Sequence, residues 1–236
     1  LIISREEIKF NNLFISRSEK LSGYLLTYFN NDIQYGSKYI LKRTMDIIVS
    51  LISIVFLSPL FIFVYLYLLY LDGRPVMIKQ NRVGLHGLQF KMYKFRTMKN
   101  NSHDLREELE DMNQNDKVIF KIENDPRLIK GALPLRNYSL DELPQFFNVL
   151  RGEMSVVGPR PLFDEDTRLF SEKYMRRLNV LPGITGLLQI NERNTSEFSI
   201  WYKYDIEYID NWSLLLDLKI ILKTPFSLFS RKVKGI

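Results

Sequence analysis

The sequence feature that most constrains the fold is an apolar run over residues 45–71, whose only charged residue is Asp46. The run is long enough for a helix to span a bilayer. Ser58 and Pro59 interrupt its middle. Because proline removes a backbone hydrogen-bond donor and clashes with the preceding turn, we expect a kink or a break at this point.

Basic residues flank the apolar run on both sides. Lys38, Lys42 and Arg43 precede it, and Arg74, Lys79 and Arg82 follow it. Since positively charged flanks favour the cytoplasmic side, this distribution pulls both ends of the run to the same side of a membrane. Two interpretations remain open: a helix that crosses the bilayer once, and a re-entrant helix that enters, bends at Ser58-Pro59 and returns.

The amino-acid composition limits the kinds of metal site and partner that the protein can have. The 236 residues allow one principal domain, and the absence of cysteine excludes disulfides and thiolate metal sites. The two histidines, His86 and His103, stand apart in polar surroundings, so we expect no histidine-rich metal site. The net charge of +6 suggests an anionic partner, which could be nucleic acid, a phosphorylated substrate or a membrane surface. The apolar run favours the membrane, and we expect no nucleic-acid partner.

Three parts are expected along the chain. Residues 1–36 form an N-terminal extension or linker, residues 37–72 the membrane helix, and residues 73–236 a cytosolic domain that ends in interfacial helices. Short strands are predicted over 76–78 and 88–93, and Gly84 and Gly87 bracket the hairpin between them. Helices are predicted over 103–111, 164–178 and 212–223, the last of them amphipathic and suited either to core packing or to a membrane interface. The expected fold class is α+β, mainly helical.

Two adjacent carboxylates, Asp141 and Glu142, lie in the stretch S-L-D-E-L-P-Q over residues 139–145. One interpretation is helix capping, with Ser139 as N-cap, Glu142 completing a capping box, and Gly152 ending the helix. The other is a catalytic pair at a helix N-terminus, where backbone N–H groups would also hold a phosphate. The two interpretations are compatible.

Cations accompany the acid pair. Lys94, Arg96, Arg136 and Arg160 each stand in a short motif bounded by apolar or turn residues, and prolines on both sides of Arg160 fix its backbone. Carboxylates and cations in one cleft suit phosphoryl chemistry, because a carboxylate approaches an anionic phosphate only where cations neutralise the charge. A divalent ion at such a site would need oxygen ligands, which favours Mg²⁺.

Five motifs recur in a recognisable order. They are K-F-R-T-M (94–98), D-P-R (125–127), S-L-D-E-L-P-Q (139–145), N-V-L-R-G-E-M-S-V-V-G-P-R-P (148–161) and P-G-I-T-G (182–186). On these motifs the chain resembles the bacterial sugar transferases known as monotopic phosphoglycosyl transferases, over roughly residues 38–224. The resemblance implies transfer of a sugar phosphate from a UDP-sugar to undecaprenyl phosphate, with release of UMP, in the first membrane step of bacterial glycan assembly.

The resemblance also implies residue roles. Asp141 would be the nucleophile that forms a covalent phosphosugar intermediate, and Glu142 would bind Mg²⁺. Lys94, Arg136 and Arg160 would hold phosphate groups, with Arg96 also expected among the substrate-binding cations. Residues 45–71 would form a re-entrant helix broken at Ser58 and Pro59.

Finer similarity points to the substrate and the location. The segment E-R-N-T (192–195), which contains Arg193, looks like the sugar-facing loop of the branch that handles UDP-hexoses such as galactose or glucose. The implied location is the cytoplasmic face of the bacterial inner membrane, in contact with membrane lipid, with homo-oligomer formation as a further expectation. The competing hypothesis is a membrane-anchored, non-catalytic binding or scaffold protein of a glycan assembly complex. Such a protein would associate with membranes without releasing UMP.

Overall fold

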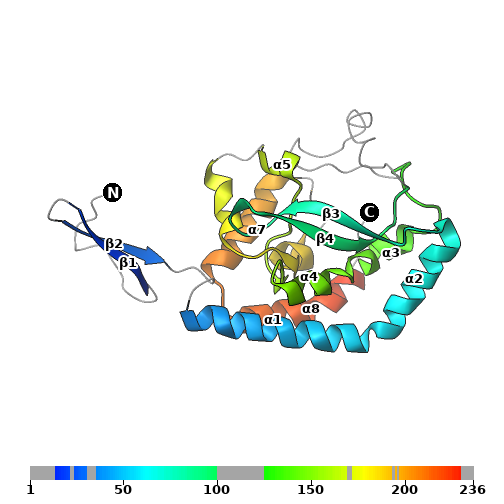
Figure 1. The fold of residues 1–236 in the computed structure, drawn as a ribbon, viewed down its shortest axis with the longest axis horizontal. Helices are drawn as coiled ribbons and strands as arrows, with labels where there is room; N and C mark the ends of the chain where they lie inside the picture. Colours follow the sequence, from blue (N-terminus) through cyan, green and yellow to red (C-terminus); the bar gives the residue numbers. More distant parts are fainter. Residues whose placement is uncertain are drawn as a thin grey trace.

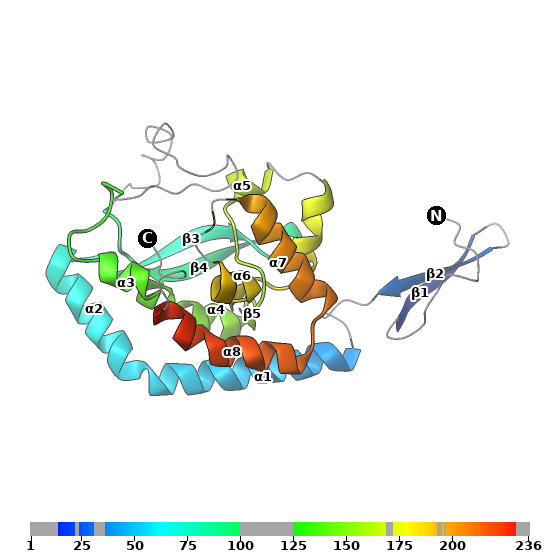
Figure 2. The ribbon, with the colours of Figure 1, turned by 180° about the vertical axis from the view of Figure 1, so that it is seen from behind.

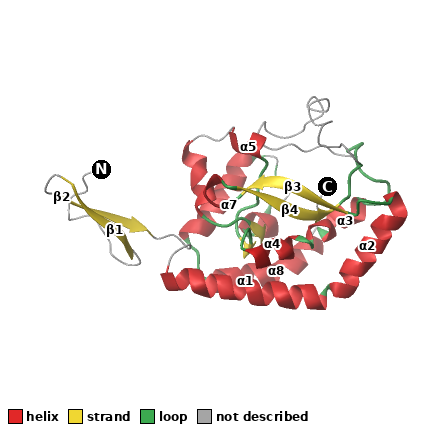
Figure 3. Cartoon of the chain, in the orientation of Figure 1, coloured by secondary structure: helices red, strands yellow, loops and turns green. Residues whose placement is uncertain are grey.

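A computed structural model describes residues 14–21, 24–30, 36–99, 125–168, 172–192, 195 and 197–229. The fold is mainly helical with small sheets, as expected (Figure 3). The helices are α1 (Gly36–Phe56), α2 (Ser58–Asp72), α3 (Leu133–Asn137), α4 (Gln145–Arg151), α5 (Asp164–Arg168), α6 (Leu187–Asn191), α7 (Phe198–Asp210) and α8 (Leu214–Phe229). The strands are β1 (Phe14–Leu21), β2 (Tyr24–Asn30), β3 (Met77–Val83), β4 (Gln89–Phe95), β5 (Ser155–Val157) and β6 (Gly183–Thr185).

The apolar run forms two helices, α1 and α2, that meet at an angle of 61° (Figure 1). The break falls at Leu57, and Pro59 occupies the first turn of α2, where its missing N–H has no helical partner to lose. The Ser58 hydroxyl donates to the Val55 carbonyl, at 2.8 Å. The predicted break at Ser58-Pro59 is therefore confirmed. Within the described residues no one helix has the length and apolar character needed to cross a bilayer, and only the bent pair taken together reaches them.

The predicted hairpin is present and longer than expected. Strands β3 and β4 pair antiparallel from Met77 opposite Phe95 to Val83 opposite Gln89, with a 3₁₀ turn over Leu85–Gly87 between them. The free edge of β4 is covered by Asn148 of α4. Its Oδ1 accepts from the Tyr93 N–H at 2.9 Å, and its Nδ2 donates to the Lys91 carbonyl at 2.8 Å. One side chain thus satisfies the edge of the sheet and fixes α4 against it.

A stripe of polar side chains holds α1 against the rest of the molecule. Lys42, Asp46 and Ser50 lie one turn apart on α1 and are all buried. The Lys42 Nζ lies 2.8 Å from Asp217 Oδ2 of α8. Asp46 Oδ1 accepts from the Ser155 hydroxyl and from the Val156 N–H, both at 3.0 Å. Helices α1 and α8 accordingly run side by side along one border of the molecule (Figures 1 and 2).

Arg43 ties α1 to the end of α4. Its guanidinium donates to the carbonyls of Val149 and Leu150, at 2.5 and 2.9 Å. The last carbonyls of a helix lack intrahelical donors and carry partial negative charge, so a cation there both satisfies and stabilises them. Gly152 closes the same helix with φ 84°, the left-handed conformation expected of a C-terminal glycine.

The short strands β5 and β6 pair in parallel at the centre of the largest core cluster. Strand β6, Gly183–Thr185, lies within the P-G-I-T-G motif. A Cβ on Gly183 would lie 2.1 Å from the backbone nitrogen of Gly158, so only glycine allows this approach. The buried hydrophobic residues of this cluster are Met92, Val149, Met154, Val156, Val157, Val180, Tyr208 and Ile220.

The remaining predictions concern three helices and the N-terminal extension. The C-terminal helix is confirmed as α8, although it begins at Leu214. The helix expected over 164–178 is instead a short α5 and a 3₁₀ segment, η4 (Glu172–Asn179), with residues 169–171 outside the description. The helix expected over 103–111 also lies outside the described residues. The N-terminal extension contains the antiparallel pair β1 and β2, which the sequence did not predict.

Candidate active site

The two adjacent acids lie in a single 3₁₀ turn, η3 (Leu140–Glu142), between α3 and α4. The predicted capping box is wrong. Ser139 has φ 56° and ψ 23°, in the left-handed region, and its side chain makes no capping hydrogen bond. An N-cap needs extended backbone geometry, so the Ser139 carbonyl, not its hydroxyl, serves the turn by accepting from the Glu142 N–H at 3.0 Å.

Both acids are buried, at 6% exposure each, and Glu142 lies between two cations. Its Oε1 is 3.1 Å from the Lys94 Nζ of β4 and 2.7 Å from a terminal nitrogen of Arg160. A buried carboxylate is costly unless it is paired and hydrogen-bonded, and these contacts supply both. Residues separated by 48 and 18 positions in sequence thus meet at one carboxylate.

The charges of the site act on one another. Burial lowers the pKa of the Lys94 ammonium below its ordinary value; Glu142 and Asp141 oppose that shift, and Arg160 and Arg82 add to it. The negative charge of Glu142 raises the pKa of Arg160, against the effect of burial, with a smaller contribution from Asp141. Asp141 therefore shares the electrostatic field of both cations, which is the setting expected for an acid that meets a phosphate.

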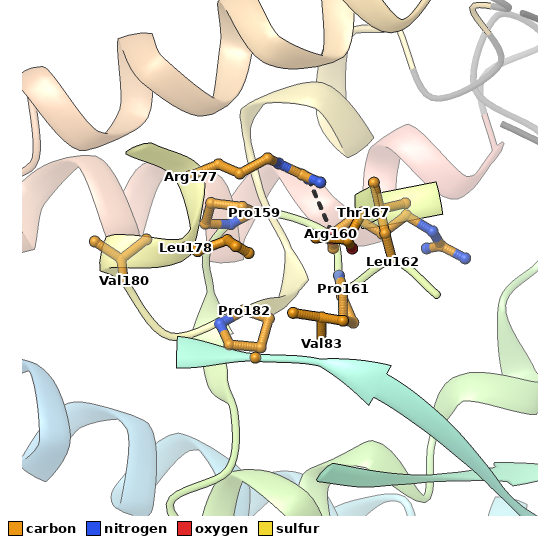
Figure 4. Close-up of a pocket in the computed structure, with 11 residues that line it drawn as sticks. Val83, Pro159, Arg160, Pro161, Leu162, Thr167, Arg177, Leu178, Val180 and Pro182 are labelled. Carbon is orange, nitrogen blue, oxygen red and sulfur yellow. Dashed lines mark hydrogen bonds between the residues drawn. The ribbon is translucent and has the colours of Figure 1, made fainter. Parts of the chain in front are cut away.

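Arg160 is held from behind by a buried ion pair that the sequence did not indicate. A terminal nitrogen of Arg177 in η4 donates to the Arg160 carbonyl at 2.9 Å (Figure 4). The same nitrogen lies 2.7 Å from Asp205 Oδ2 of α7, and the Arg177 Nε donates to that oxygen at 2.9 Å. Arg177 and Asp205 are 3% and 4% exposed.

The pocket in Figure 4 lies beside this pair and is lined by Pro159, Pro161 and Pro182, among others. Its volume of about 10 Å³ is at the lower limit for one water molecule. The backbone side of Arg160 is therefore closely packed, and a substrate would meet Arg160 on the side that carries Glu142.

Comparison with known proteins decides the family. The bacterial sugar transferase family matches residues 37–231. The chain belongs to this family. The match covers α2, all of α1 after Gly36 and every residue of the site described above, so the resemblance to the bacterial sugar transferases is confirmed.

Individual family members are similar over most of this chain. It is 39% identical over 223 residues to the galactosyl transferase CpsE of Streptococcus agalactiae, covering 94% of this chain and 49% of the relative. It is 38% identical over 207 residues to the undecaprenyl-phosphate galactose phosphotransferase of Salmonella typhimurium (85% and 43%). It is 40% identical over 229 residues to the UDP-glucose:undecaprenyl-phosphate glucose-1-phosphate transferase of Klebsiella pneumoniae (94% and 47%). The chain spans about half the length of these relatives.

A second cationic group lies around α3. Asp125 accepts from the backbone and side chain of Arg127, at 2.6 to 3.2 Å. Burial works to raise the pKa of Asp125, but these hydrogen bonds, with the charges of Arg127 and Arg136, outweigh it and lower the pKa. The Nη1 of Arg136 is buried and has no hydrogen-bond partner among the described residues. Arg136 therefore keeps a donor for a ligand.

Arg96 was expected to bind substrate, and the structure places it elsewhere. Its guanidinium donates to the carbonyl oxygens of Asp72, Gly73 and Pro75 and pairs with the Asp72 carboxylate. These contacts fasten the end of β4 to the end of α2, so the geometry gives Arg96 a structural task. Arg193, expected in the sugar-facing loop, lies outside the described residues.

Arg82 on β3 belongs to the electrostatic surroundings of the site, although the sequence marked it only as a basic flank. The guanidinium carbon of Arg82 lies 3.3 Å from the centre of the Phe163 ring, and the Arg82 Nη2 donates to Gln80 Oε1 at 3.3 Å. Alternation along β3 places Arg82, like Ile78, on the hairpin face shared with Lys94. The alternation of side chains along the predicted hairpin is the sequence signal that could have placed Arg82 near Lys94.

Proposed function

We propose that this sugar transferase moves a hexose-1-phosphate from a UDP-sugar, with glucose or galactose as the hexose, to undecaprenyl phosphate. The observation that carries the proposal is the buried pair Asp141 and Glu142, with Lys94 and Arg160 converging on Glu142. The names of the relatives from Salmonella and Klebsiella support the two substrates.

In the first step an oxygen of the Asp141 carboxylate attacks the sugar-linked phosphorus. The bond between that phosphorus and the bridging oxygen breaks, and UMP leaves with the oxygen and its electron pair. The product is an aspartyl phosphosugar. Attack by an anion on a diphosphate requires neutralised charge. Lys94 and Arg160 supply it from one side, and the Nη1 of Arg136, which has no partner among the described residues, supplies it from α3.

In the second step a phosphate oxygen of undecaprenyl phosphate attacks the same phosphorus. The bond to Asp141 breaks and the carboxylate is regenerated, leaving a lipid-linked diphosphate sugar. Each step forms one P–O bond and breaks one, so no oxidant or further reactant is needed. The two carboxylates have separate roles, because Glu142 is neutralised by two cations while Asp141 attacks.

Magnesium fits this site as an ion that arrives with the diphosphate. The described residues contain no cluster of three or more carboxylate or histidine side chains that could hold a metal alone. Mg²⁺ commonly uses one or two carboxylates together with substrate phosphates, and Glu142 would be its protein ligand here, in competition with Lys94 and Arg160. When bound, it would supply further neutralisation of the diphosphate charge.

The bent pair α1 and α2 is proposed to insert into the cytoplasmic membrane from its cytoplasmic face and return to the same side. Three observations support this arrangement: the 61° bend, basic residues on both flanks, and large apolar side chains exposed along both helices. The apolar stripe of α8, formed by Leu215, Leu218, Leu222 and Phe226, is also exposed and is proposed to lie in the interface.

The test is Asp141→Asn in the full chain, reconstituted with undecaprenyl phosphate and supplied with UDP-glucose or UDP-galactose. We expect UMP release to stop while the thermal unfolding temperature stays close to that of the parent protein, since asparagine nearly preserves the shape of aspartate. Asp210→Asn, in an exposed ion pair, is the matched control and should release UMP normally.

Intact-mass measurement without acceptor lipid gives a second readout. The parent protein should gain the mass of a hexose phosphate, and after digestion that mass should lie on the peptide that contains Asp141. Normal UMP release by Asp141→Asn, or membrane binding by the parent protein without any UMP release, would refute the proposal and favour a non-catalytic scaffold.

A further inference from the structure

A shallow apolar groove lies between the β3–β4 hairpin and α4. Its volume is about 460 Å³, and it is lined by Met77, Tyr93, Phe147, Leu150 and Arg151. Met77 and Phe147 are 39% and 40% exposed, and they lie together in this groove instead of singly on the surface. The groove therefore offers apolar surface for which the described residues provide no cover.

Two cations meet at one aromatic ring in this groove. The Arg151 guanidinium carbon lies 5.0 Å from the centre of the Tyr93 ring and its Nη1 donates to the Tyr93 hydroxyl, while the Lys79 Nζ lies 5.5 Å from the same centre. Neither cation pairs with a carboxylate within the described parts of the chain. An anion placed between them would relieve their mutual repulsion.

The groove is separate from the acid pair. In the hairpin register Tyr93 lies opposite Lys79, and the next residue, Lys94, lies opposite Ile78. Because successive side chains of a strand point to opposite faces, Tyr93 and Lys79 share the face that Lys94 does not use. Lys94 reaches Glu142 from its own face, so a ligand in the groove would not touch the carboxylates.

The groove also continues the apolar surface of the bent helix pair. The ring of Phe147 meets the ring of Phe61 on α2 edge to face, with centroids 6.1 Å apart. Beyond Phe61, the α2 side chains of Ile62, Phe63 and Leu66 are exposed. A molecule whose chain lies along α2 could therefore bring its headgroup to Arg151 and Lys79.

We propose that this groove binds an anionic phospholipid of the bilayer, with its phosphate between Arg151 and Lys79 and the start of an acyl chain against Met77, Phe147 and Leu150. The proposal rests on the membrane association proposed above, but not on the transfer reaction. Its consequence is orientation: a bound headgroup fixes the hairpin and α4 at a set height over the bilayer, and with them the adjoining η3 turn that holds Asp141.

The test uses the full chain in nanodiscs and a photoactivatable phosphatidylglycerol whose reactive group sits near the top of one acyl chain. We expect labelling of peptides that contain Met77 or Phe147, and little labelling by the matching phosphatidylcholine probe. Lys79→Gln and Arg151→Gln should each weaken labelling by about fivefold, and together by about thirtyfold. Lys203→Gln removes an exposed cation from α7, which contributes no residue to the groove, and is the matched control, with labelling unchanged.

Equal labelling by the two probes, or labelling that survives in the double variant, would overturn the proposal. Displacement of the probe by undecaprenyl phosphate at lower concentration than by phosphatidylglycerol would also overturn it, because the groove would then belong to the acceptor. UMP release measured on the same nanodiscs separates the two ideas. Its absence in the parent protein would contradict the transferase function, whereas the labelling result would still stand.

Discussion

Replacing Arg177 tests whether the buried ion pair beneath Arg160 positions that arginine or only stabilises the fold. Arg177→Met leaves Asp205 buried without its cation. Breaking a buried ion pair by removing one partner typically costs about 3–5 kcal/mol. Burial already raises the pKa of Asp205 and Arg177 opposes that shift, so in the variant the carboxyl takes up a proton more readily, which limits the loss. For a chain of 236 residues a loss of about 3 kcal/mol lowers Tm by about 10 °C.

A double variant separates the two roles. Arg177→Met with Asp205→Leu replaces the ion pair by apolar side chains, an exchange that is often neutral for stability. The donor to the Arg160 carbonyl is still missing, and misplacement of a catalytic group by about 1 Å can cost about a hundredfold in rate. We therefore expect Tm to recover in the double variant while kcat for UMP release stays reduced by between about tenfold and a hundredfold.

The neighbouring pair provides the control. Arg176 binds Asp210 at 2.6 Å and joins the same two elements, but both side chains are about half exposed, at 52% and 50%. Arg176→Met should cost less than about 1 kcal/mol and leave kcat unchanged. Recovery of both Tm and kcat in the double variant would refute a positioning role. Equal effects of Arg176→Met and Arg177→Met would refute the argument from burial.

Two further predictions concern charge and topology. Glu142→Gln removes the negative charge that opposes the lowering of the Lys94 pKa, so that pKa should fall further. Lys94 should then react faster with an amine-acylating reagent at mildly alkaline pH, as measured by peptide mass spectrometry, with Lys203 as the internal control. Unchanged Lys94 reactivity would contradict the charge assignment. Membrane-impermeant lysine labels applied to inside-out vesicles should modify both Lys38 and Lys79, and finding these two lysines on opposite sides would exclude a re-entrant helix.

Local signals in the sequence were sufficient for the elements whose causes are local. The break at Ser58-Pro59 follows from proline geometry, and the hairpin follows from Gly84 and Gly87 between two β-prone segments. The cap at Ser139 failed although its pattern was correct, because the same S-x-x-E spacing fits a 3₁₀ turn that begins from a left-handed residue. The backbone dihedrals of Ser139 depend on how the turn that follows it packs against α3 and β4, and the spacing of the motif does not report that packing.

The site itself could be predicted only in part. Asp141, Glu142, Lys94 and Arg160 were identified, and three of them are now seen in contact. Arg177 and Asp205, 28 residues apart, form their pair through tertiary packing that no periodicity reports. The sequence also could not distinguish two kinds of arginine. The donors of Arg96 bind Asp72 and Gly73 at the end of α2, whereas Arg136 Nη1 has no partner among the described residues.

The contacts of α1 with the body of the molecule have a practical consequence. A shorter fragment that begins at β3 would lose three sets of contacts. Asp217 would lose its ion pair with Lys42, and the last carbonyls of α4 would lose their donor Arg43. The Val156 N–H would lose its acceptor, the Asp46 carboxylate. Helix α1 is therefore a structural component of the folded core. Because α1 and α2 are proposed to enter the membrane, purification should keep both helices and supply detergent or lipid from the first step.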